Sequence, residues 1–441
     1  RDVGPRIGHL RRALCVVCRH AVQEGCPFPG FEVIARLLLP AGVGRQVMPL
    51  LMGRALRAFV DGYVAVLLPV YLLALGLGLK DVGFVASATL FGSALATLAV
   101  GAWGHRFHHV HLLTGAAILM ACTGFAFASL SMFWPLLLVA FIGTLNPSSG
   151  DVSVFLPLEH ARLANASQGG ERTSLFARYS LVGSLFAAIG SLAAAFPQWL
   201  ETMGGLSSLD ALRAMFLLYG AMGVLIWLMY RRLPTPKVEE ERKPQRLEKS
   251  RAIVWRLAVL FSVDSFAGGL AINALLALWL FERFHLSLAT AGVFFFWTGL
   301  CSALSQLAAP VLAKRIGLLN TMVFTHIPAS IFLVAAAFVP SVEWALALLL
   351  LRALLSQMDV PARGAFVMAV VTPEERAAAA SFTAVPRSLA SAAGPSLGGL
   401  LLAGGWLAAP LLVCGVLKIA YDLTLWLSFK SHVMSLGATD K

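Results

Sequence analysis

Four aspartates stand in long apolar stretches of the sequence, where a charge is costly. Asp61 and Asp264 occupy the similar contexts Val-Asp-Gly-Tyr and Val-Asp-Ser-Phe, and Asp151 and Asp359 each precede a valine. An ionised carboxylate at the centre of a membrane helix costs about 2.5–3.5 kcal/mol on insertion scales. A proton, a cationic partner or the water of a central cavity must therefore compensate each of these groups.

Arginines stand at helical spacing from several of these aspartates. Arg57 precedes Asp61 by four residues, Arg363 follows Asp359 by four, and Arg352 shares a helical face with Asp359. Such pairs could hold helices together and gate the protein at its cytoplasmic side. The residues predicted to form this charge network or gate are Asp151, Asp359, Arg178, Arg352, Arg363 and Arg387.

A second interpretation gives a carboxylate a role in coupling. Burial and the loss of a cationic partner both favour the protonated form of a carboxyl group. A carboxylate that changes partner between two conformations would therefore bind and release a proton. Asp61 and Asp264, which are both flanked by small residues, are the predicted proton-coupling sites.

The elements that carry these residues are predicted to be membrane helices. The 441-residue chain is 59% hydrophobic and 13% charged, whereas soluble domains contain about 25% charged residues. Its apolar spans are each long enough to cross about 30 Å of hydrocarbon, where backbone groups must bond within the span. The twelve predicted spans are 50–77, 82–103, 110–130, 134–161, 173–196, 209–230, 253–280, 287–312, 319–339, 343–370, 375–403 and 407–429.

The charged loops predict the orientation. Fourteen Lys and Arg residues fall in the even-numbered loops and two in the odd-numbered loops, which places both termini in the cytoplasm. This bias accounts for the formal net charge of +12, so we do not predict nucleic-acid binding. The longest loop, Arg231 to Arg251, is rich in charge and proline and is predicted to be a linker between six spans and six.

The two groups of six spans repeat one another. Asp61 and Asp264 are 203 residues apart, and Asp151 and Asp359 are 208 apart. Nearly constant offsets indicate internal duplication, which transporters often show. The predicted fold is an all-α integral membrane protein with twelve transmembrane helices in two six-helix pseudo-repeats. Its predicted divisions are a basic N-terminal tail (1–47), an N-terminal bundle (48–230), a cytoplasmic linker (231–252), a C-terminal bundle (253–430) and a C-terminal tail (431–441).

Two loops resemble the signature of a known family. The loop after the second span contains Gly101 and Arg106, and the loop after the eighth contains Arg315 and Gly317. Their spacing is similar to Gly-x-x-x-Asp-Arg-x-Gly-Arg-Arg of the major facilitator superfamily, although His105 and Lys314 replace the aspartate. The resemblance extends over about residues 50–430. It implies that spans one, four, seven and ten, which carry the four aspartates, line a central cavity.

Further polar residues are candidates for the cavity. Helix breaks are predicted at Asn146–Asp151 and Asp359–Pro361, because proline removes a backbone donor. Lys418 and Asp422, four residues apart on the last span, are predicted to pair outside the cavity. The predicted substrate-binding candidates are Tyr63, Asn146, Tyr179, Asn273 and Gln357.

No metal or cofactor site is predicted. Cys15 and Cys18 form a C-x-x-C pair in the N-terminal tail, but no second pair follows them. The histidines between His105 and His111 are most simply basic replacements in a cytoplasmic loop. No catalytic motif or phosphate-binding loop is present, so neither an enzyme nor an ATP-driven pump is predicted.

The predicted function is secondary active transport of a small organic solute by alternating access, as proton-coupled efflux. One alternative is uptake or facilitated diffusion of an organic anion held by Arg178, Arg352 or Arg387. An alternative of another class is a membrane sensor or lipid-handling protein that transports nothing. We expect a multi-pass monomer in a plasma or inner membrane, with the solute, protons and bilayer lipid as its partners.

Overall fold

The computed structural model describes the backbone of residues 44, 47–148, 153–166, 169–233, 248, 250–372 and 375–439. It does not describe the side chains of residues 105, 165, 169–173, 377 and 431–439. Asp151, nearly all of the predicted N-terminal tail and most of the predicted linker therefore lie outside the described residues.

Each half of the chain is a set of helices. The first half contains α3 (Met48–Ala74), α4 (Leu79–Trp103), η2 (Gly104–Arg106), α5 (His109–Ser129), α6 (Phe133–Ile142), α7 (Phe155–Asn165), α8 (Gly169–Leu192), η3 (Ala193–Ala195), α9 (Phe196–Gly204) and α10 (Ser208–Tyr230). The second half contains α11 (Arg251–Gly269), α12 (Asn273–Phe284), α13 (Leu288–Ile316), α14 (Leu318–Phe338), α15 (Val342–Ser356), α16 (Asp359–Val370), α17 (Arg376–Ala403) and α18 (Ala409–Thr439).

The helices match the predicted spans. In the described part of the chain, 10 helices are long and apolar enough to cross a membrane. The other two spans are the fourth, which divides into α6 and α7, and the eleventh, α17, which is 28 residues long. Large apolar side chains such as Trp134 and Phe338 point outward, as they do where lipid is the solvent. The all-helical fold of twelve spans in two halves is as predicted.

Spans four, seven and ten are each interrupted near the middle. In span four the described residues between α6 and α7, 143–148 and 153–154, are not helical, and span ten breaks at residues 357–358, close to the two predicted breaks. Pro361 lies in the first turn of α16, where the missing N–H removes no helical hydrogen bond. Span seven breaks at residues 270–272, directly after Gly268 and Gly269, and the sequence did not predict this break.

The breaks in spans four and seven meet between the two halves. The backbone N–H of Ala274 in α12 donates to the carbonyl oxygen of Pro147 across 3.0 Å. The interruption in span four therefore offers its free carbonyl to the other half, instead of only bending the helix. A helix break inside a bundle is stable only where such partners satisfy its backbone.

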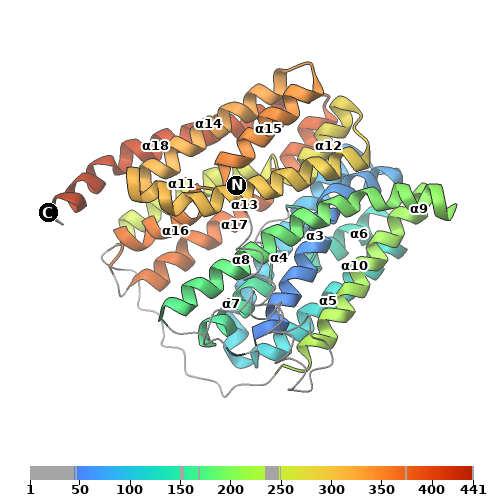
Figure 1. Ribbon diagram of the computed structural model, residues 1–441, viewed down its shortest axis with the longest axis horizontal. Helices are drawn as coiled ribbons and strands as arrows, with labels where there is room; N and C mark the ends of the chain where they lie inside the picture. Colours follow the sequence, from blue (N-terminus) through green and yellow to red (C-terminus); the bar gives the residue numbers. More distant parts are fainter. Residues whose placement is uncertain are drawn as a thin grey trace, which may run out of the picture.

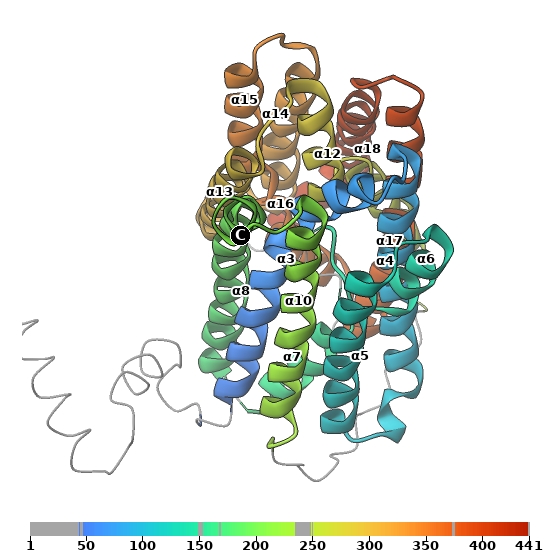
Figure 2. The ribbon, with the colours of Figure 1, turned by 90° about the vertical axis from the view of Figure 1, so that its right-hand side faces the viewer.

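The two halves form a V. In Figure 1 they converge near α12 and α9 and spread apart toward α16 on one side and α7 on the other. Figure 2 shows α3, α8, α10 and α5 of the first half running side by side, with α12, α14 and α15 of the second half beyond them. We call the end with the loops of Arg106, Arg315 and Arg376 the basic end, and the other the closed end.

A seam of small residues joins α4 and α17 at the closed end. A Cβ atom on Gly83 would lie 2.5 Å from the carbonyl oxygen of Pro395 and 2.8 Å from the Cα of Gly399. The backbone N–H of Ser396 donates to Oγ of Ser87 across 2.7 Å. The halves can approach this closely only because glycine has no side chain at these points.

A second seam joins α8 and α13. A Cβ atom on Gly292 would lie 2.6 Å from the carbonyl oxygen of Ser191, and one on Gly299 would lie 2.9 Å from the Cβ of Ala188. Both seams belong to the closed end, so the space between the halves opens toward the basic end. If the basic end faces the cytoplasm, as the loop charges predict, this conformation is inward-facing.

Replacement of Gly83 by valine should open the closed end, because the added side chain overlaps the backbone of α17. We expect several-fold faster maleimide labelling of a cysteine placed at Ser87, in a background without the native cysteines. Gly101→Val on the same helix is the matched control, since no atom outside its own helix lies within 4 Å of a Cβ there. Equal labelling rates in the two valine variants would contradict the seam.

Candidate functional site

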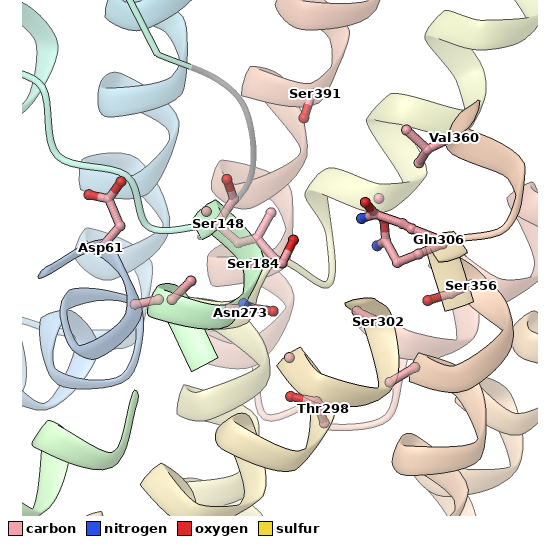
Figure 3. Close-up of a pocket in the computed structure, with 18 of the residues that line it drawn as sticks. Asp61, Ser148, Ser184, Asn273, Thr298, Ser302, Gln306, Ser356, Val360 and Ser391 are labelled. Carbon is pink, nitrogen blue, oxygen red and sulfur yellow. The ribbon is translucent and has the colours of Figure 1, made fainter. Parts of the chain in front are cut away.

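A cavity of about 730 Å³ lies between the two halves. Phe295 is the one Phe, Tyr or Trp on its walls among the described residues, and many hydroxyl and amide side chains lie there among small apolar residues. Figure 3 shows Asp61, Ser148 and Ser184 of the first half and Asn273, Ser302, Gln306, Ser356 and Ser391 of the second around this space. The charged or imidazole side chains of the walls are Arg54, Asp61, His160, Asp264, His326, Arg352, Arg363, Arg387 and Lys418.

Asp61 lies on the first-half wall of the cavity, in α3. The charges of Arg57 and Arg54 both act on its carboxylate. The neighbouring Gly62 allows α3 to meet α8, because a Cβ there would lie 2.1 Å from the carbonyl oxygen of Ala187. Close packing therefore fixes the position of Asp61 relative to the cavity.

Arg57 forms its hydrogen bonds with Glu159 of α7, although the i, i+4 spacing had suggested a pair with Asp61. Its Nη1 and Nη2 atoms donate to the two carboxylate oxygens of Glu159 across 2.7 and 2.6 Å. Tyr179 and Tyr230 both donate their hydroxyl protons to the same carboxylate. Glu159 is fully buried, so this bidentate pair is shielded from water. It holds α3, α7, α8 and α10 together.

Asp264 is the centre of a second group of charges, in the other half. Its Oδ2 atom accepts from Nη2 of Arg363 across 2.8 Å, and its Oδ1 atom accepts from Nζ of Lys418 across 2.7 Å. Arg363 also binds Asp359, one turn earlier on α16, as its i, i+4 spacing suggested. Both carboxylates are buried, and both have a cationic partner.

His326 of α14 connects this group to Asp422. Its Nδ1 atom lies 2.9 Å from Oδ2 of Asp422, and its Nε2 atom lies 3.3 Å from Nζ of Lys418. An ammonium group can only donate, so Nε2 accepts from Lys418 and Nδ1 carries the imidazole proton toward Asp422. We name Asp264, His326, Asp359, Arg363, Lys418 and Asp422 the Asp264 cluster.

The predicted pair of Lys418 with Asp422 outside the cavity is wrong. Lys418 turns toward Asp264 and lines the cavity, and Asp422 binds His326 instead. The i, i+4 spacing allowed the pair, but each group has a partner on another helix in a low-dielectric interior. Helical spacing alone does not reveal such partners.

The predicted arginines occupy different places. Arg352 of α15 and Arg387 of α17 line the cavity, and Arg363 lies in its wall within the Asp264 cluster. Arg178 of α8 is partly buried but does not belong to the described lining of the cavity. The ion pairs of Arg57, Arg363 and Lys418 each stay within one half. In this conformation these three pairs therefore do not join the halves as a gate would.

The predicted substrate-binding candidates also divide. Asn273 and Gln357 line the cavity. Tyr63 is buried in the first half and donates to the carbonyl oxygen of Met215 across 3.0 Å, and Tyr179 binds Glu159. Asn146 is buried and accepts from Oγ of Ser148 across 2.7 Å. Ser148, which the sequence analysis did not select, lines the cavity in its place.

The loop signature lies at the basic end, away from the cavity. Gly101 and Arg106 are exposed, as is Arg315. Gly317 ends α13 and begins α14 with φ of +86°, a conformation that favours glycine. No group of three or more His, Cys, Asp or Glu side chains suited to a metal ion occurs among the described residues.

The sequence analysis missed three residues of these charge groups. Glu159 lies near the basic end of span four, where a charge suggests the end of a helix rather than its interior. His326 is a single histidine in an apolar span, and Lys418 seemed paired already. The spacing of Glu159 and His326 from their partners, 102 and 96 residues, gives no local signal.

Comparisons with known proteins agree with this architecture. A family model described as Major Facilitator Superfamily matches residues 50–278 and 257–435. The chain therefore belongs to the Major Facilitator Superfamily, a family of membrane transporters.

Individual relatives are distant. An uncharacterized membrane protein of Saccharomyces cerevisiae, YJR124C, is 23% identical over 413 residues, which cover 84% of this chain and 91% of that protein. The structure is similar to an inward-facing, occupied bacterial homolog of the human lysosomal transporter Spinster, with a TM-score of 0.69 and 16% identity over 87% of this chain and 96% of that one. It is also similar to a D-xylose-proton symporter, with a TM-score of 0.68 and 15% identity over 86% and 97% of the two chains.

Replacement of Glu159 by glutamine should destabilise the protein strongly, because it leaves the buried Arg57 without a counter-charge. Loss of one partner of a buried ion pair costs about 3–5 kcal/mol. We expect the melting temperature in detergent to fall by on the order of 10 °C.

Asp210→Asn is the matched control, because Asp210 forms an exposed ion pair with Arg213. Exposed pairs contribute about 1 kcal/mol or less, so its melting temperature should barely change. The double variant Arg57→Leu with Glu159→Gln should recover part of the loss, since no uncompensated charge remains. Equal melting temperatures for Glu159→Gln and Asp210→Asn would show that the Arg57–Glu159 pair contributes little.

Proposed function

We propose that this chain is a proton-coupled secondary transporter that moves a small polar solute by alternating access. Its family and fold are those of membrane transporters. The observation that carries the proton coupling is the Asp264 cluster, a buried group of charges that reaches the wall of the central cavity.

The charges of the Asp264 cluster leave room for a proton. Asp264, Asp359 and Asp422 are three carboxyl groups, whereas Arg363 and Lys418 are two cations, and the imidazole is neutral in the observed hydrogen-bond arrangement. In a medium of low dielectric constant, an uncompensated negative charge favours binding of a proton. The charge count of these six residues therefore leaves room for one more proton within the cluster.

Other groups face the cluster and influence that proton. The guanidinium of Arg387 acts on Asp264 and Asp359 from α17 without forming a hydrogen bond or ion pair in the described part of the chain. The ring of Tyr421 lies against His326, with 6.2 Å between ring centroids. Cys414 lies near enough to Lys418 for the two to interact electrostatically. A proton bound to the cluster is therefore sensitive to anything that engages Arg387.

The cavity gives the proton a path to water. Asp264, His326 and Lys418 all line it, so a proton can reach the cluster when the cavity is open. Asp61, on the opposite half, remains a second candidate because it faces the same cavity. The two positions are equivalent in the duplicated sequence, and Asp264 is bonded through Lys418 to the imidazole of His326.

Alternating access requires that the seams at the closed end separate while the basic end closes. The seams consist of glycine contacts and few hydrogen bonds, which can separate without breaking a buried ion pair. Export remains the predicted direction, and a monomer in a plasma or inner membrane remains the predicted setting. The proposal gives the chain no catalytic role.

Reconstituted wild-type protein should couple solute movement to protons. Labelled sugars, nucleosides and organic acids would first be screened by counterflow, and a solute that exchanges would then be tested with a pH dye inside the liposomes. We expect Asp264→Asn and His326→Gln to lose proton movement at least tenfold while counterflow continues, because counterflow needs no net proton transfer. Asp61→Asn tests the second candidate in the same assay.

Asp210→Asn, which changes an exposed carboxylate, should behave like the wild type in both assays. Gradient-driven accumulation that persists in the Asp61, Asp264 and His326 variants would overturn coupling through these groups. Absence of counterflow for every solute in the screen would instead favour a membrane protein that transports nothing.

A further inference from the structure

Arg352 and Arg387 differ from the other charged groups of the cavity. Neither guanidinium forms a hydrogen bond or an ion pair within the part of the chain that the structure describes, yet both line the cavity. A guanidinium group is always charged, so it cannot avoid the cost of burial by losing a proton. Its charge must be balanced by water, by an ion or by a ligand.

The described lining of the cavity contains more cations than carboxylates. The cations are Arg54, Arg352, Arg363, Arg387 and Lys418, and the carboxylates are Asp61 and Asp264. Arg363 and Lys418 are already bound to Asp264. Arg352 and Arg387, which have no ion pair among the described residues, therefore favour a ligand of negative charge.

Each of these two arginines has a serine one helical turn away. Ser356 follows Arg352 by four residues on α15, and Ser391 follows Arg387 by four on α17. Both serines line the cavity, and neither hydroxyl forms a hydrogen bond among the described residues. A guanidinium group and a hydroxyl group on one helical face together offer several donors to an oxyanion.

The remaining lining suits a polar solute. Asn273, Gln306 and Gln357 add amide groups, whereas Phe295 is the one Phe, Tyr or Trp among the described lining residues. A flat apolar molecule would find few surfaces on which to stack, and it would leave these polar groups without partners. The cavity therefore matches a small solute that carries hydrogen-bonding groups.

From these observations we propose that the transported solute is a small organic anion, a carboxylate or phosphate ester, whose oxyanion binds Arg352 and Arg387. This proposal rests on the proposed transport function and names the chemical class of its substrate.

The position of Arg387 links this anion to the proton. Arg387 is the cation that faces Asp264 and Asp359 without an ion pair to either. When an oxyanion engages it, less of its charge is left to offset the three carboxyl groups of the cluster. The other groups that face the carboxyl groups contribute the same charge with and without the anion. They are Arg363, Lys418, His326 and Tyr421. A proton therefore binds more readily to the occupied cavity, so the anion and the proton move in the same direction. Under an inward proton gradient this direction is uptake, the alternative to the export that the sequence predicted.

Binding can be measured on the purified full-length protein by thermal shift and by calorimetry. The probes are lactate, succinate and glycerol 3-phosphate, with glycerol and xylose as uncharged controls. We expect at least one anion to bind and raise the melting temperature, and the uncharged compounds to have no effect. Arg352→Gln and Arg387→Gln should each weaken anion binding by about tenfold or more, because each removes a charge-assisted hydrogen bond.

Two variants separate charge from stability. Arg387→Lys keeps the positive charge and should retain part of the affinity, whereas Arg283→Gln, which changes an exposed arginine outside the cavity in the last turn of α12, should bind as the wild type does. Binding of only the carboxylates, or of only glycerol 3-phosphate, would identify which of the two oxyanions the site accepts. Uncharged compounds binding as well as anions, no anion binding at all, or full affinity in the double variant Arg352→Gln with Arg387→Gln would each overturn the proposal.

A transport assay distinguishes this inference from the proposed function. An anion that enters liposomes together with protons supports both, and proton movement opposite to the anion would overturn the shared direction. An anion that binds and exchanges without any proton movement would leave the substrate class standing and refute proton coupling. Proton-coupled transport of an uncharged solute, without transport of any anion, would support proton coupling and refute the anionic substrate class.

Discussion

The structure depends on one constraint: a buried charge needs a partner of opposite charge in the same half of the protein. Arg57 is balanced by Glu159 within the first half, and Asp264 by Arg363 and Lys418 within the second. In a low-dielectric interior, separation of such partners costs about 3–5 kcal/mol for each pair broken. Because these partners belong to the same half, the halves can rotate against each other without that cost. These ion pairs therefore do not resist a rotation of one half against the other.

The described contacts between the halves at the closed end include few hydrogen bonds and none of these ion pairs. At the closed end α4 meets α17, and α8 meets α13, through glycine and serine with few hydrogen bonds. Close backbone approach gives dispersion energy that depends steeply on distance, so a seam of this kind is lost almost completely once it opens slightly. A backbone hydrogen bond from Ala274 to Pro147 uses the helix breaks of spans four and seven. Helix breaks thus connect the halves where continuous helices would offer no free carbonyl.

The sequence predicted the fold more fully than it predicted the candidate site. Three features of the sequence predicted twelve spans in two halves: apolar runs near 20 residues, the charges of the loops, and the nearly constant offsets between the halves. The pairing of Asp359 with Arg363 followed from helical spacing, but the bonds of Arg57 and Lys418 did not. Partners such as Glu159 and His326 lie on other helices, and helix rotation decides which faces meet. A single sequence contains no direct record of that rotation.

Duplication gave the halves equivalent aspartates, and the surroundings made them different. In the first half, Arg57 is held by Glu159 and two tyrosine hydroxyls, so it has little freedom to respond to a ligand. In the second half, hydrogen bonds of Lys418 connect Asp264 to the imidazole of His326. The guanidinium of Arg387 faces Asp264 without a hydrogen bond to it. The described bonds of the second half therefore place a buried cluster of charges beside a cation that has no ion pair among the described residues. Under the proposed function, this half responds to ligand and proton as it moves against the first.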